Sequence, residues 1–467
     1  MPASTLLKRS LAGTALALMF TGVQAQQPAP TPQVPAAERP EDAPVSGEMP
    51  LADIRAFAEA FERIKRGYVD EVDDQTLLHG AIRGMLAELD PHSSYLDAEQ
   101  LSDLREATEG EFGGIGIEVG LEQGRPAVIS PIDDTPAARA GLKPHDLILS
   151  IDGTSTDGMS LEEAVGKMRG EIGSPITLGI GREGESEPLI VELERASIRA
   201  NSVTSRRLAG DIGYVRISQF QVRTGEDLRK AIQSLNDERP VEGLVLDLRN
   251  NPGGVLNAAV DVGSVFIPSG LVVYTEGRIE GSESRFEANG DPMAPELPIV
   301  VLINSGTASA AEIVAGALQD HHRAVIMGTD SFGKGSVQTV LPLDNGGALK
   351  LTTALYYTPD GRSIQAEGIV PDVEVAPARI TSEAAQQLLR ETDLERHLEN
   401  AAPRPEQAVP EGDQEGAQDD PTATDYQLHE ATNLLKALKV VERGRQAREA
   451  SAPASAPASA PAAANDE

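Results

Sequence analysis

From Ala200 onward, apolar strand patterns alternate with amphipathic helix patterns, and this alternation constrains the fold more than any other feature of the chain. The strand-like runs are "IGYVRISQF", "GLVLDLRNNPGG", "LPIVVLINSG" and "AVIMG", and the helical patterns are "EDLRKAIQSLND", a run from Leu256 and a run after Ser309. Such alternation is typical of an α/β layer structure with much parallel pairing. We therefore expect an α/β core over residues 197–378, closed by the strands "GSVQTVLPL" and "GALKLTTALYY".

The first 25 residues have the pattern of an export signal. Lys8 and Arg9 precede the short apolar run "LAGTALALMF", and "VQA" before Gln26 is a small-residue cleavage site. The apolar run has about half of the roughly 20 residues that a membrane-spanning helix needs, which disfavours a membrane anchor. We expect cleavage after Ala25 and an exported, periplasmic protein that is soluble or peripherally attached to a membrane.

Five more segments are distinguished by composition and periodicity. We expect a Pro/Ala-rich linker over 26–50, an N-terminal helical segment over 51–108, a module of short strands and glycine turns over 109–196, a helical region with an acidic linker over 379–449, and a low-complexity tail over 450–467. A helical arm beyond a flexible link suits a homodimer, and a solvated tail fits it almost as well.

Composition excludes several functions. The formal net charge of −33 disfavours nucleic acid as a partner, because phosphate binding needs a basic surface. Without cysteine the chain has no disulfides, thiolate metal sites or cysteine nucleophile. Without tryptophan and with 3% aromatic residues, nothing suggests a haem or flavin pocket. We expect no cofactor and no metal.

Three hydroxyl residues, Ser305, Thr307 and Ser309, lie where the strand "LPIVVLIN" turns into a helix. Backbone N–H groups at such a turn and the helix dipole stabilise developing negative charge, so one hydroxyl is a candidate nucleophile. The ordinary alternative is that these residues are helix N-caps. His321 and His322 at the far end of the helix are excluded as the base, because His321 lies about 18 Å along the axis from Ser309.

A lysine is the other candidate base. Lys334 lies between two glycines in "SFGKGSVQT", after the strand "AVIMG", and the chain returns toward the helix start there if that strand is parallel to "LPIVVLIN". Burial would depress its pKa and make it a base. In a strand, Lys334, Ser336 and Gln338 would share a face, and Gln338 could orient the amine without adding charge. Four strand residues span about 13 Å, so the contact requires Lys334 to lie in a bent turn.

A second strand–turn–helix, "LVLDLRNNPGGVL", offers hydrogen-bond donors. The glycines Gly253 and Gly254 leave backbone N–H groups unshielded. If the two turns face each other, the N–H groups of Gly254 and Ala310 would form a two-donor oxyanion hole. On spacing alone, "NPGG" is an ordinary turn signal.

Together these stretches resemble the carboxyl-terminal processing protease family, serine peptidases with a Ser-Lys dyad. The match extends over about residues 50–378 through "LDPHSSYL", "FGGIGIEV", "SPIDDTPAARAGLKPHDLILSIDG", "LDLRNNPGG", "NSGTASAAEIVAGALQD", "FGKGSVQT" and "TPDGRSIQAEGIVPDV". The resemblance implies a crotonase/ClpP-like core, with Ser309 as nucleophile, Lys334 as base and Gln338 as its orienting partner. The family often has Ser at the position of Ala311, and its absence here narrows the choice to Ser309.

The resemblance also implies that residues 109–196 form an inserted PDZ domain. A loop like "FGGIGI" would bind a substrate's C-terminal carboxylate, while the following strand pairs with the peptide as an added strand. The expected substrate-binding residues are Phe112, Gly113, Gly114, Ile115, Gly116 and Ile117. Apolar surroundings favour protein or peptide substrates with nonpolar C-termini, and an adaptor protein is left open.

Arg169, in "KMRGEIG", resembles a recurrent arginine of the family that would couple the PDZ domain to the core; a surface ion pair is its ordinary alternative. Two other functions compete with the leading one. A chymotrypsin-like PDZ protease would need a double β-barrel, which the α/β alternation disfavours. A non-catalytic PDZ scaffold would lack the dyad.

Overall fold

A computed structural model describes residues 50–122, 124–279, 281–293, 295–378, 422 and 424–451. The predicted signal peptide, almost all of the Pro/Ala-rich linker, the helical pattern over 379–400 and the low-complexity tail from residue 452 onward lie outside the described residues. The chain divides into two compact units, Met1–Ala58 and Glu59–Glu467. In the first unit, the described part is residues 50–58, which contain the start of helix α1 (Leu51–Gly67).

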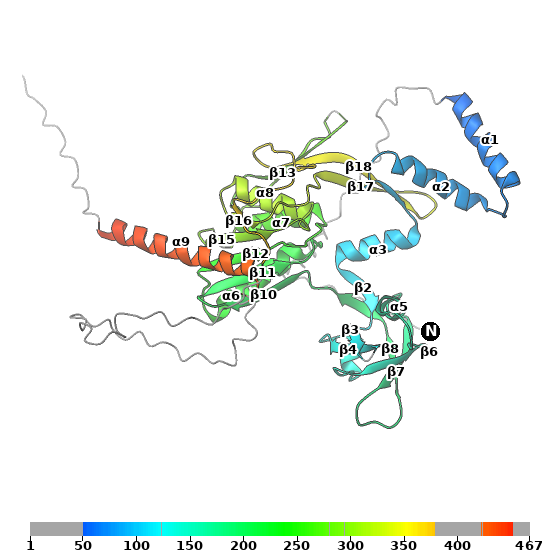
Figure 1. Cartoon of the computed structure of the whole chain (residues 1–467), viewed down its shortest axis with the longest axis horizontal. Coiled ribbons are helices and arrows are strands. Elements are labelled where there is room, and N and C mark those ends of the chain that lie inside the picture. The colour runs from blue at the N-terminus through cyan, green and yellow to red at the C-terminus, as the bar shows by residue number, and fades with distance from the viewer. Residues whose placement is uncertain are drawn as a thin grey trace, which may run out of the picture. The chain divides into compact units, whose positions relative to one another are not determined.

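The α/β core of the second unit contains a six-stranded sheet in the order β10-β11-β12-β15-β16-β19. Figure 1 labels the first five of these strands. Every pair from β11 to β19 is parallel, and β10 is antiparallel to β11. The strands are β10 (Val203–Leu208), β11 (Ile212–Ile217), β12 (Gly243–Asp247), β15 (Ile299–Ile303), β16 (Val325–Gly328) and β19 (Val373–Glu374). The predicted α/β core with parallel pairing is confirmed, including the parallel register of "AVIMG" with "LPIVVLIN".

Both faces of this sheet are covered, as continuous apolar strands require. Side chains on one face pack with helices α6, α7 and α8, and side chains on the other face pack with α9. These helices are α6 (Thr224–Glu238), α7 (Leu256–Phe266), α8 (Ala310–Asp320) and α9 (Tyr426–Ser451). On the α9 face, the contact is made by Leu428, Ala431 and Leu435, so the first turns of the predicted C-terminal helix are packed against the sheet.

A second sheet has the order β1-β18-β13-β14, and β17 also pairs with β18. Its strands are β1 (Ser94–Leu96), β13 (Leu271–Gly277), β14 (Ser284–Glu287), β17 (Ser336–Pro342) and β18 (Ala348–Tyr357). The predicted strands "GSVQTVLPL" and "GALKLTTALYY" form an antiparallel hairpin in this sheet. Strand β1 comes from the "LDPHSSYL" segment, so the N-terminal segment contributes a strand to the sheet that carries this hairpin.

Residues 111–199 form the module of short strands. A two-stranded sheet pairs β2 (Glu111–Gly114) with β9 (Ala196–Arg199), and a larger sheet has the order β3-β4-β5-β7-β8, with β6 paired to β5. Its elements are β3 (Ile117–Glu122), β4 (Arg125–Pro131), α4 (Pro136–Arg139), β5 (Leu147–Ile151), β6 (Thr154–Ser155), α5 (Leu161–Met168), β7 (Pro175–Gly181) and β8 (Leu189–Glu194). Strand β3 stands at an edge of the larger sheet, so its outer backbone groups are available to another strand.

The N-terminal segment contains α2 (Asp74–Ala87) and a further helix, α3 (Ala98–Glu109), in addition to α1. Helix α3 lies almost wholly within the helical segment expected over residues 51–108, although its own bounds were not predicted. Its signals are present, because Asp97 and Gln100 form a capping box at its start and Gly110 ends it with φ 75°. Among the described helices, none is both long and apolar enough to cross a bilayer.

Candidate functional site

Two neighbouring strands of the core sheet, β12 and β15, each end in a turn that leads into a helix. Because these strands are parallel, their carboxyl ends lie at the same edge of the sheet. Asn250 and Asn304 join the two turns by a reciprocal pair of hydrogen bonds of 2.9 and 3.0 Å. The Asn251 carbonyl accepts from the Ala308 N–H at 2.9 Å. The two turns therefore face each other, as the prediction required.

Ser309 is the residue immediately before α8, and it has a strained backbone. Its φ of 56° and ψ of −117° are rare for a residue with a side chain, and such strain is typical of nucleophile turns. Its side chain is 6% exposed. A Cβ at Gly253 would lie 2.7 Å from the Ser309 Cβ, so only glycine allows the second turn to approach the serine this closely.

The other two hydroxyls have different surroundings. Thr307 is buried, and its Oγ1 donates to the Leu248 carbonyl at 2.8 Å and accepts from the Asn304 N–H at 3.0 Å. Ser305 is exposed. The ring of His321 contacts the Leu271 carbonyl at the far end of α8. Thr307 is therefore a structural residue of the turn. His321 lies far from Ser309, as expected from the length of the helix.

Gly254 forms an isolated parallel bridge with Phe220 and presents its own N–H away from Phe220. The Gly253 carbonyl and the Val255 N–H make the bridge to Phe220 at 2.8 Å each, and alternate backbone groups point to opposite sides. The φ of Gly254 is 140°, and a Cβ there would lie 2.0 Å from the Phe220 carbonyl oxygen. Ala310 is the first residue of α8, where the N–H has no partner within the helix. Both predicted oxyanion donors therefore have N–H groups that can serve a ligand.

Lys334 lies in the loop just before β17, so it is outside the strand. Its side chain is partly buried. Burial lowers the pKa of Lys334 below its usual value, the charge of Lys350 lowers it further, and the charge of Glu312 opposes both. A depressed pKa makes the neutral amine, which is the form that acts as a base, more available at a given pH.

Glu312 connects the turn that contains Ser309 (the serine turn) to the loop that contains Lys334. It was not among the site residues expected from the sequence. Its carboxylate is fully buried and accepts hydrogen bonds from the Ser309 N–H at 2.7 Å and the Lys334 N–H at 2.9 Å. It also accepts from Ser331 Oγ at 2.6 Å and the Gly333 N–H at 2.7 Å. The signal that could have found it is an acidic residue three positions after a helix N-cap.

Gln338 donates through Nε2 to Ser336 Oγ at 3.0 Å and to Thr352 Oγ1 at 3.3 Å. The contact with Ser336 agrees with their predicted common face, although the register shifts between Val337 and Gln338. Within the described residues, no direct hydrogen bond joins the side chains of Ser309, Lys334 and Gln338. Ser309 and Lys334 are held by the same carboxylate instead.

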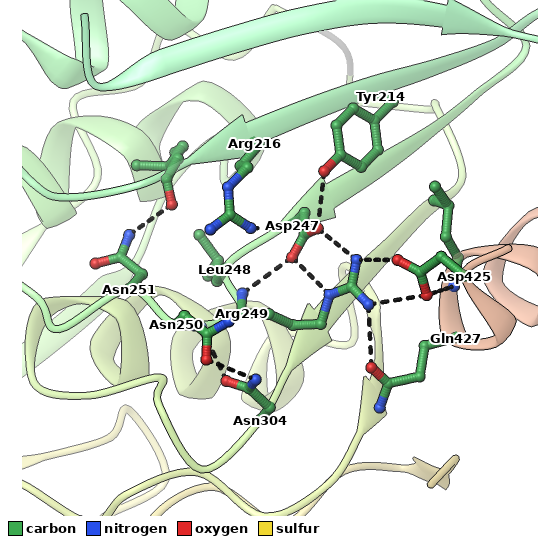
Figure 2. A network of polar contacts seen from close by, with 12 residues as sticks. Tyr214, Arg216, Asp247, Leu248, Arg249, Asn250, Asn251, Asn304, Asp425 and Gln427 are labelled. Carbon is green, nitrogen blue, oxygen red and sulfur yellow. Dashed lines mark hydrogen bonds and ion pairs between the residues drawn. The ribbon is translucent and has the colours of Figure 1, made fainter. Parts of the chain in front are cut away.

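A buried ion network holds the end of β12, just before the turn that contains Gly253 and Gly254 (the glycine turn). Figure 2 shows Asp247 between Tyr214 and Arg249, and Arg249 between Asp247 and Asp425. Asp247 is fully buried, and Arg249 Nη2 lies 2.7 Å from an oxygen of both Asp247 and Asp425. Gln427 accepts a further hydrogen bond from Arg249 at 3.0 Å. The start of α9 is therefore tied to the strand that leads into the glycine turn.

The predicted peptide loop lines an apolar groove of about 220 Å³ between β3 and α5. The lining residues are Phe112, Gly114, Ile115, Gly116, Ile117, Val119, Val165, Met168 and Arg169. Gly113 lies beside this lining, where its carbonyl accepts from the Gly170 N–H at 3.1 Å. A groove between an edge strand and a helix is the arrangement into which an added peptide strand fits.

Arg169 makes a contact that the sequence did not predict. Its guanidinium lies 4.3 Å from the centre of the Phe112 ring, at one end of the groove, and no ion pair of this side chain is present among the described residues. The surface ion pair is therefore replaced by a cation–π contact. No group of three or more His, Cys, Asp or Glu side chains in the described ranges could hold a metal ion.

Three family models match the chain. Residues 211–375 match peptidase family S41, residues 113–193 match the PDZ domain, and residues 12–100 match the N-terminal domain of the activating protease CtpB. The first two ranges fall within the core and the strand module described above.

The chain is also similar to curated proteases. It is 49% identical over 384 residues to a carboxy-terminal-processing protease of Bartonella bacilliformis, which covers 81% of this chain and 87% of the relative. It is 40% identical over 326 residues to a carboxyl-terminal-processing protease of Synechocystis, covering 67% of this chain and 76% of the relative. Among solved structures, the photosystem II D1 C-terminal processing protease matches with a TM-score of 0.41 and 33% identity, covering 68% of this chain and 92% of that one.

Proposed function

The chain belongs to peptidase family S41, with the carboxy-terminal-processing proteases, and from this premise we propose that it cleaves proteins with a Ser309–Lys334 dyad. The family membership makes it a serine-type peptidase with a PDZ domain. The observation that carries the dyad is the fully buried Glu312 carboxylate, which holds the backbone of both residues within hydrogen-bond distance.

In the proposed reaction, Ser309 Oγ attacks the carbonyl carbon of the scissile bond while Lys334 Nζ takes the hydroxyl proton. The N–H groups of Gly254 and Ala310 stabilise the resulting oxyanion. The C–N bond then breaks, and the Lys334 ammonium gives its proton to the leaving amine. Water hydrolyses the acyl-enzyme ester with Lys334 again as base. Gln338 orients the amine and adds no charge that would raise its pKa.

We test the dyad with single variants and a protein substrate that has a nonpolar C-terminus. Ser309→Ala and Lys334→Ala are each expected to abolish cleavage and labelling by an acylating serine probe. Ser305→Ala is the matched control, because this exposed hydroxyl lies in the same turn outside the proposed dyad. Full activity of Lys334→Ala would overturn the dyad, and an unlabelled wild-type protein would favour a non-catalytic PDZ scaffold.

The PDZ groove is proposed to bind the C-terminus of the substrate. The edge position of β3 and the apolar lining of the groove support this assignment. Amidation of the substrate's C-terminal carboxylate should weaken binding, and so should a charged last residue. Arg169 is proposed to couple the occupied groove to the core. Arg169→Ala should lower the stimulation of cleavage by a separate nonpolar C-terminal peptide, and unchanged stimulation would contradict this.

Export to the periplasm, with cleavage after Ala25, is proposed from the N-terminal sequence pattern. Sequencing the N-terminus of the protein from a cell fraction should then give Gln26 as the first residue. A homodimer and an adaptor protein are further proposals. Capture of partners by the Ser309→Ala protein, which retains uncleaved substrates, together with the mass of the protein in solution, tests them.

A further inference from the structure

The turn between α2 and β1 contains a carboxylate that is hydrogen-bonded beyond the needs of the turn. Asp90 Oδ1 accepts from the N–H groups of His92 at 2.8 Å and Ser93 at 3.0 Å, and Oδ2 accepts from Ser93 Oγ at 2.6 Å. These three contacts are local. A fourth comes from far along the chain, because Thr352 Oγ1 lies 3.1 Å from Asp90 Oδ1.

Asp90 is ionised at neutral pH. Its partial burial raises the pKa, but the hydrogen bonds from Ser93, His92 and Thr352 outweigh this and hold the pKa below its usual value. An ionised carboxylate has no proton to donate and only accepts. Thr352 must therefore be the donor in its contact with Asp90.

This contact fixes which way the Gln338 amide points. A hydroxyl has one hydrogen, and Thr352 uses it on Asp90, so Thr352 can only accept from Gln338. The atom of Gln338 that faces Thr352 is therefore the amide nitrogen. The second hydrogen of this nitrogen goes to Ser336 Oγ at 3.0 Å. The orientation of an amide is set by such partners and not by its shape.

The two ends of this chain of contacts lie on one sheet. Ser94 and Lys350 are paired residues of β1 and β18, and the Thr352 N–H donates to Ser93 Oγ at 3.1 Å. Gln338 and Thr352 are paired residues of β17 and β18. The N-terminal turn is therefore attached to the same strand that carries the partner of Gln338.

We propose that Asp90 is a positioning residue for the catalytic lysine: through Thr352 it orients the Gln338 carboxamide so that Oε1 is the atom presented to the ammonium group of Lys334. This inference rests on the proposed dyad. If Thr352 were free to donate, the amide could turn over and present its N–H₂ to Lys334. An ammonium group and an amide N–H₂ are both donors and do not bond to each other.

The test compares two substitutions of Thr352 in the full-length protein. Thr352→Ser keeps the hydroxyl, and Thr352→Val replaces it with a methyl group of similar shape. We expect kcat to fall by about 10- to 100-fold for Val, at least ten times more than for Ser, since small misplacements of catalytic groups have effects of this size. Thr353→Val is the control, because its hydroxyl contacts Thr339 on the exposed face of the same hairpin.

Two further measurements separate positioning from a structural effect. In a Gln338→Ala background, Thr352→Val and Asp90→Ala should change kcat by less than about twofold, because the group they orient is absent. The rise of kcat/KM with pH should also move to lower pH in Thr352→Val, as in Gln338→Ala. Loss of the Oε1 contact removes a hydrogen bond that stabilises the charged lysine and so lowers its pKa.

The outcomes distinguish this inference from the dyad itself. If Ser309→Ala and Lys334→Ala are inactive while Thr352→Val keeps full kcat and an unchanged pH profile, Asp90 is a turn residue only and the dyad stands. Equal losses with and without Gln338 would also reject the relay. If Lys334→Ala keeps activity, the dyad itself fails, whatever Thr352→Val does.

Discussion

The two turns that meet at the edge of the core sheet are built alike and held differently. Both follow a buried parallel strand and lead into a helix. Apart from the hydrogen bonds that join the two turns, the serine turn is held by the carboxylate of Glu312, three residues after Ser309. The glycine turn is held from outside, by Arg249, which reaches across to Asp425 at the start of α9. The serine turn is thus supported by a residue near it in the sequence, whereas the glycine turn depends on Asp425, which lies 176 residues from Arg249.

This difference predicts different sensitivities. Damage to the local carboxylate should affect the serine and the lysine together, because both backbones donate to it. Damage to the remote ion pair should loosen the glycine turn and α9 and leave the serine turn in place. Four substitutions examine this contrast.

The largest effect is expected for Glu312→Ala. Three buried donors and one part-buried donor lose their acceptor, and each unsatisfied buried group costs about 1–3 kcal/mol, so the free energy of unfolding should fall by roughly 4 kcal/mol or more. Urea unfolding measures the change. Glu163→Ala is the matched control, because Glu163 occupies the same position of α5 but is exposed, and its loss should be much smaller. Equal losses in the two variants would contradict the role of the buried carboxylate.

Gly254→Ala should have the next largest effect, on kcat. The added Cβ would lie 2.0 Å from the Phe220 carbonyl, so the turn must shift and take the N–H with it. Loss of one oxyanion donor typically lowers kcat by about 10²–10³-fold. Steady-state kinetics of a folded variant measures this. Gly346→Ala is the control, since its φ of 82° also disfavours a side chain but the added Cβ would meet open space. A kcat unchanged from wild type would remove Gly254 from the oxyanion hole.

Asp425→Ala should have a smaller effect that is confined to the glycine turn. Arg249 loses a charged partner, and hydrogen bonds to charged groups contribute about 1.5–3 kcal/mol, so the free energy of unfolding should fall by about 2 kcal/mol. Hydrogen exchange should increase at α9 and at Gly254, with little change at Ala310. Glu242→Gln, which removes the charge that pairs Glu242 with Lys439 of α9, is the control. Equal exchange at both turns would show that they are not held independently.

Lys350→Gln should have the smallest effect, on pH dependence. The charge of Lys350 lowers the pKa of Lys334, so its removal raises that pKa toward the usual value of 10.5. The neutral amine is then populated only at higher pH, and the rise of kcat/KM with pH should move upward. Lys350→Arg keeps the charge and should leave the profile in place. A profile that moves equally in both variants would indicate an effect of shape, not charge.

Local patterns predicted much of the molecule correctly. The strand and helix periodicities between Ala200 and Pro377 predicted the parallel sheet and its covering helices, because periodicity reflects which side of an element is buried. The helix before Glu111 was expected only as part of the helical segment over 51–108 and not as a separate element, although Asp97 and Gly110 mark its ends. The surface ion pair that was the ordinary alternative for Arg169 is absent among the described residues, because its guanidinium stacks on the Phe112 ring instead.

By itself, the sequence determined the strand–turn–helix junctions, the candidate nucleophile turn and the exclusion of His321, because helix rise, turn chemistry and burial patterns depend on residues that are near in the chain. The tertiary structure alone decided that Glu312 joins Ser309 to Lys334, that Asp425 completes the ion network of Arg249, and that Asp90 lies against Thr352. These contacts join groups that the path of the whole chain brings together. No local pattern specifies which distant donor will meet which carboxylate.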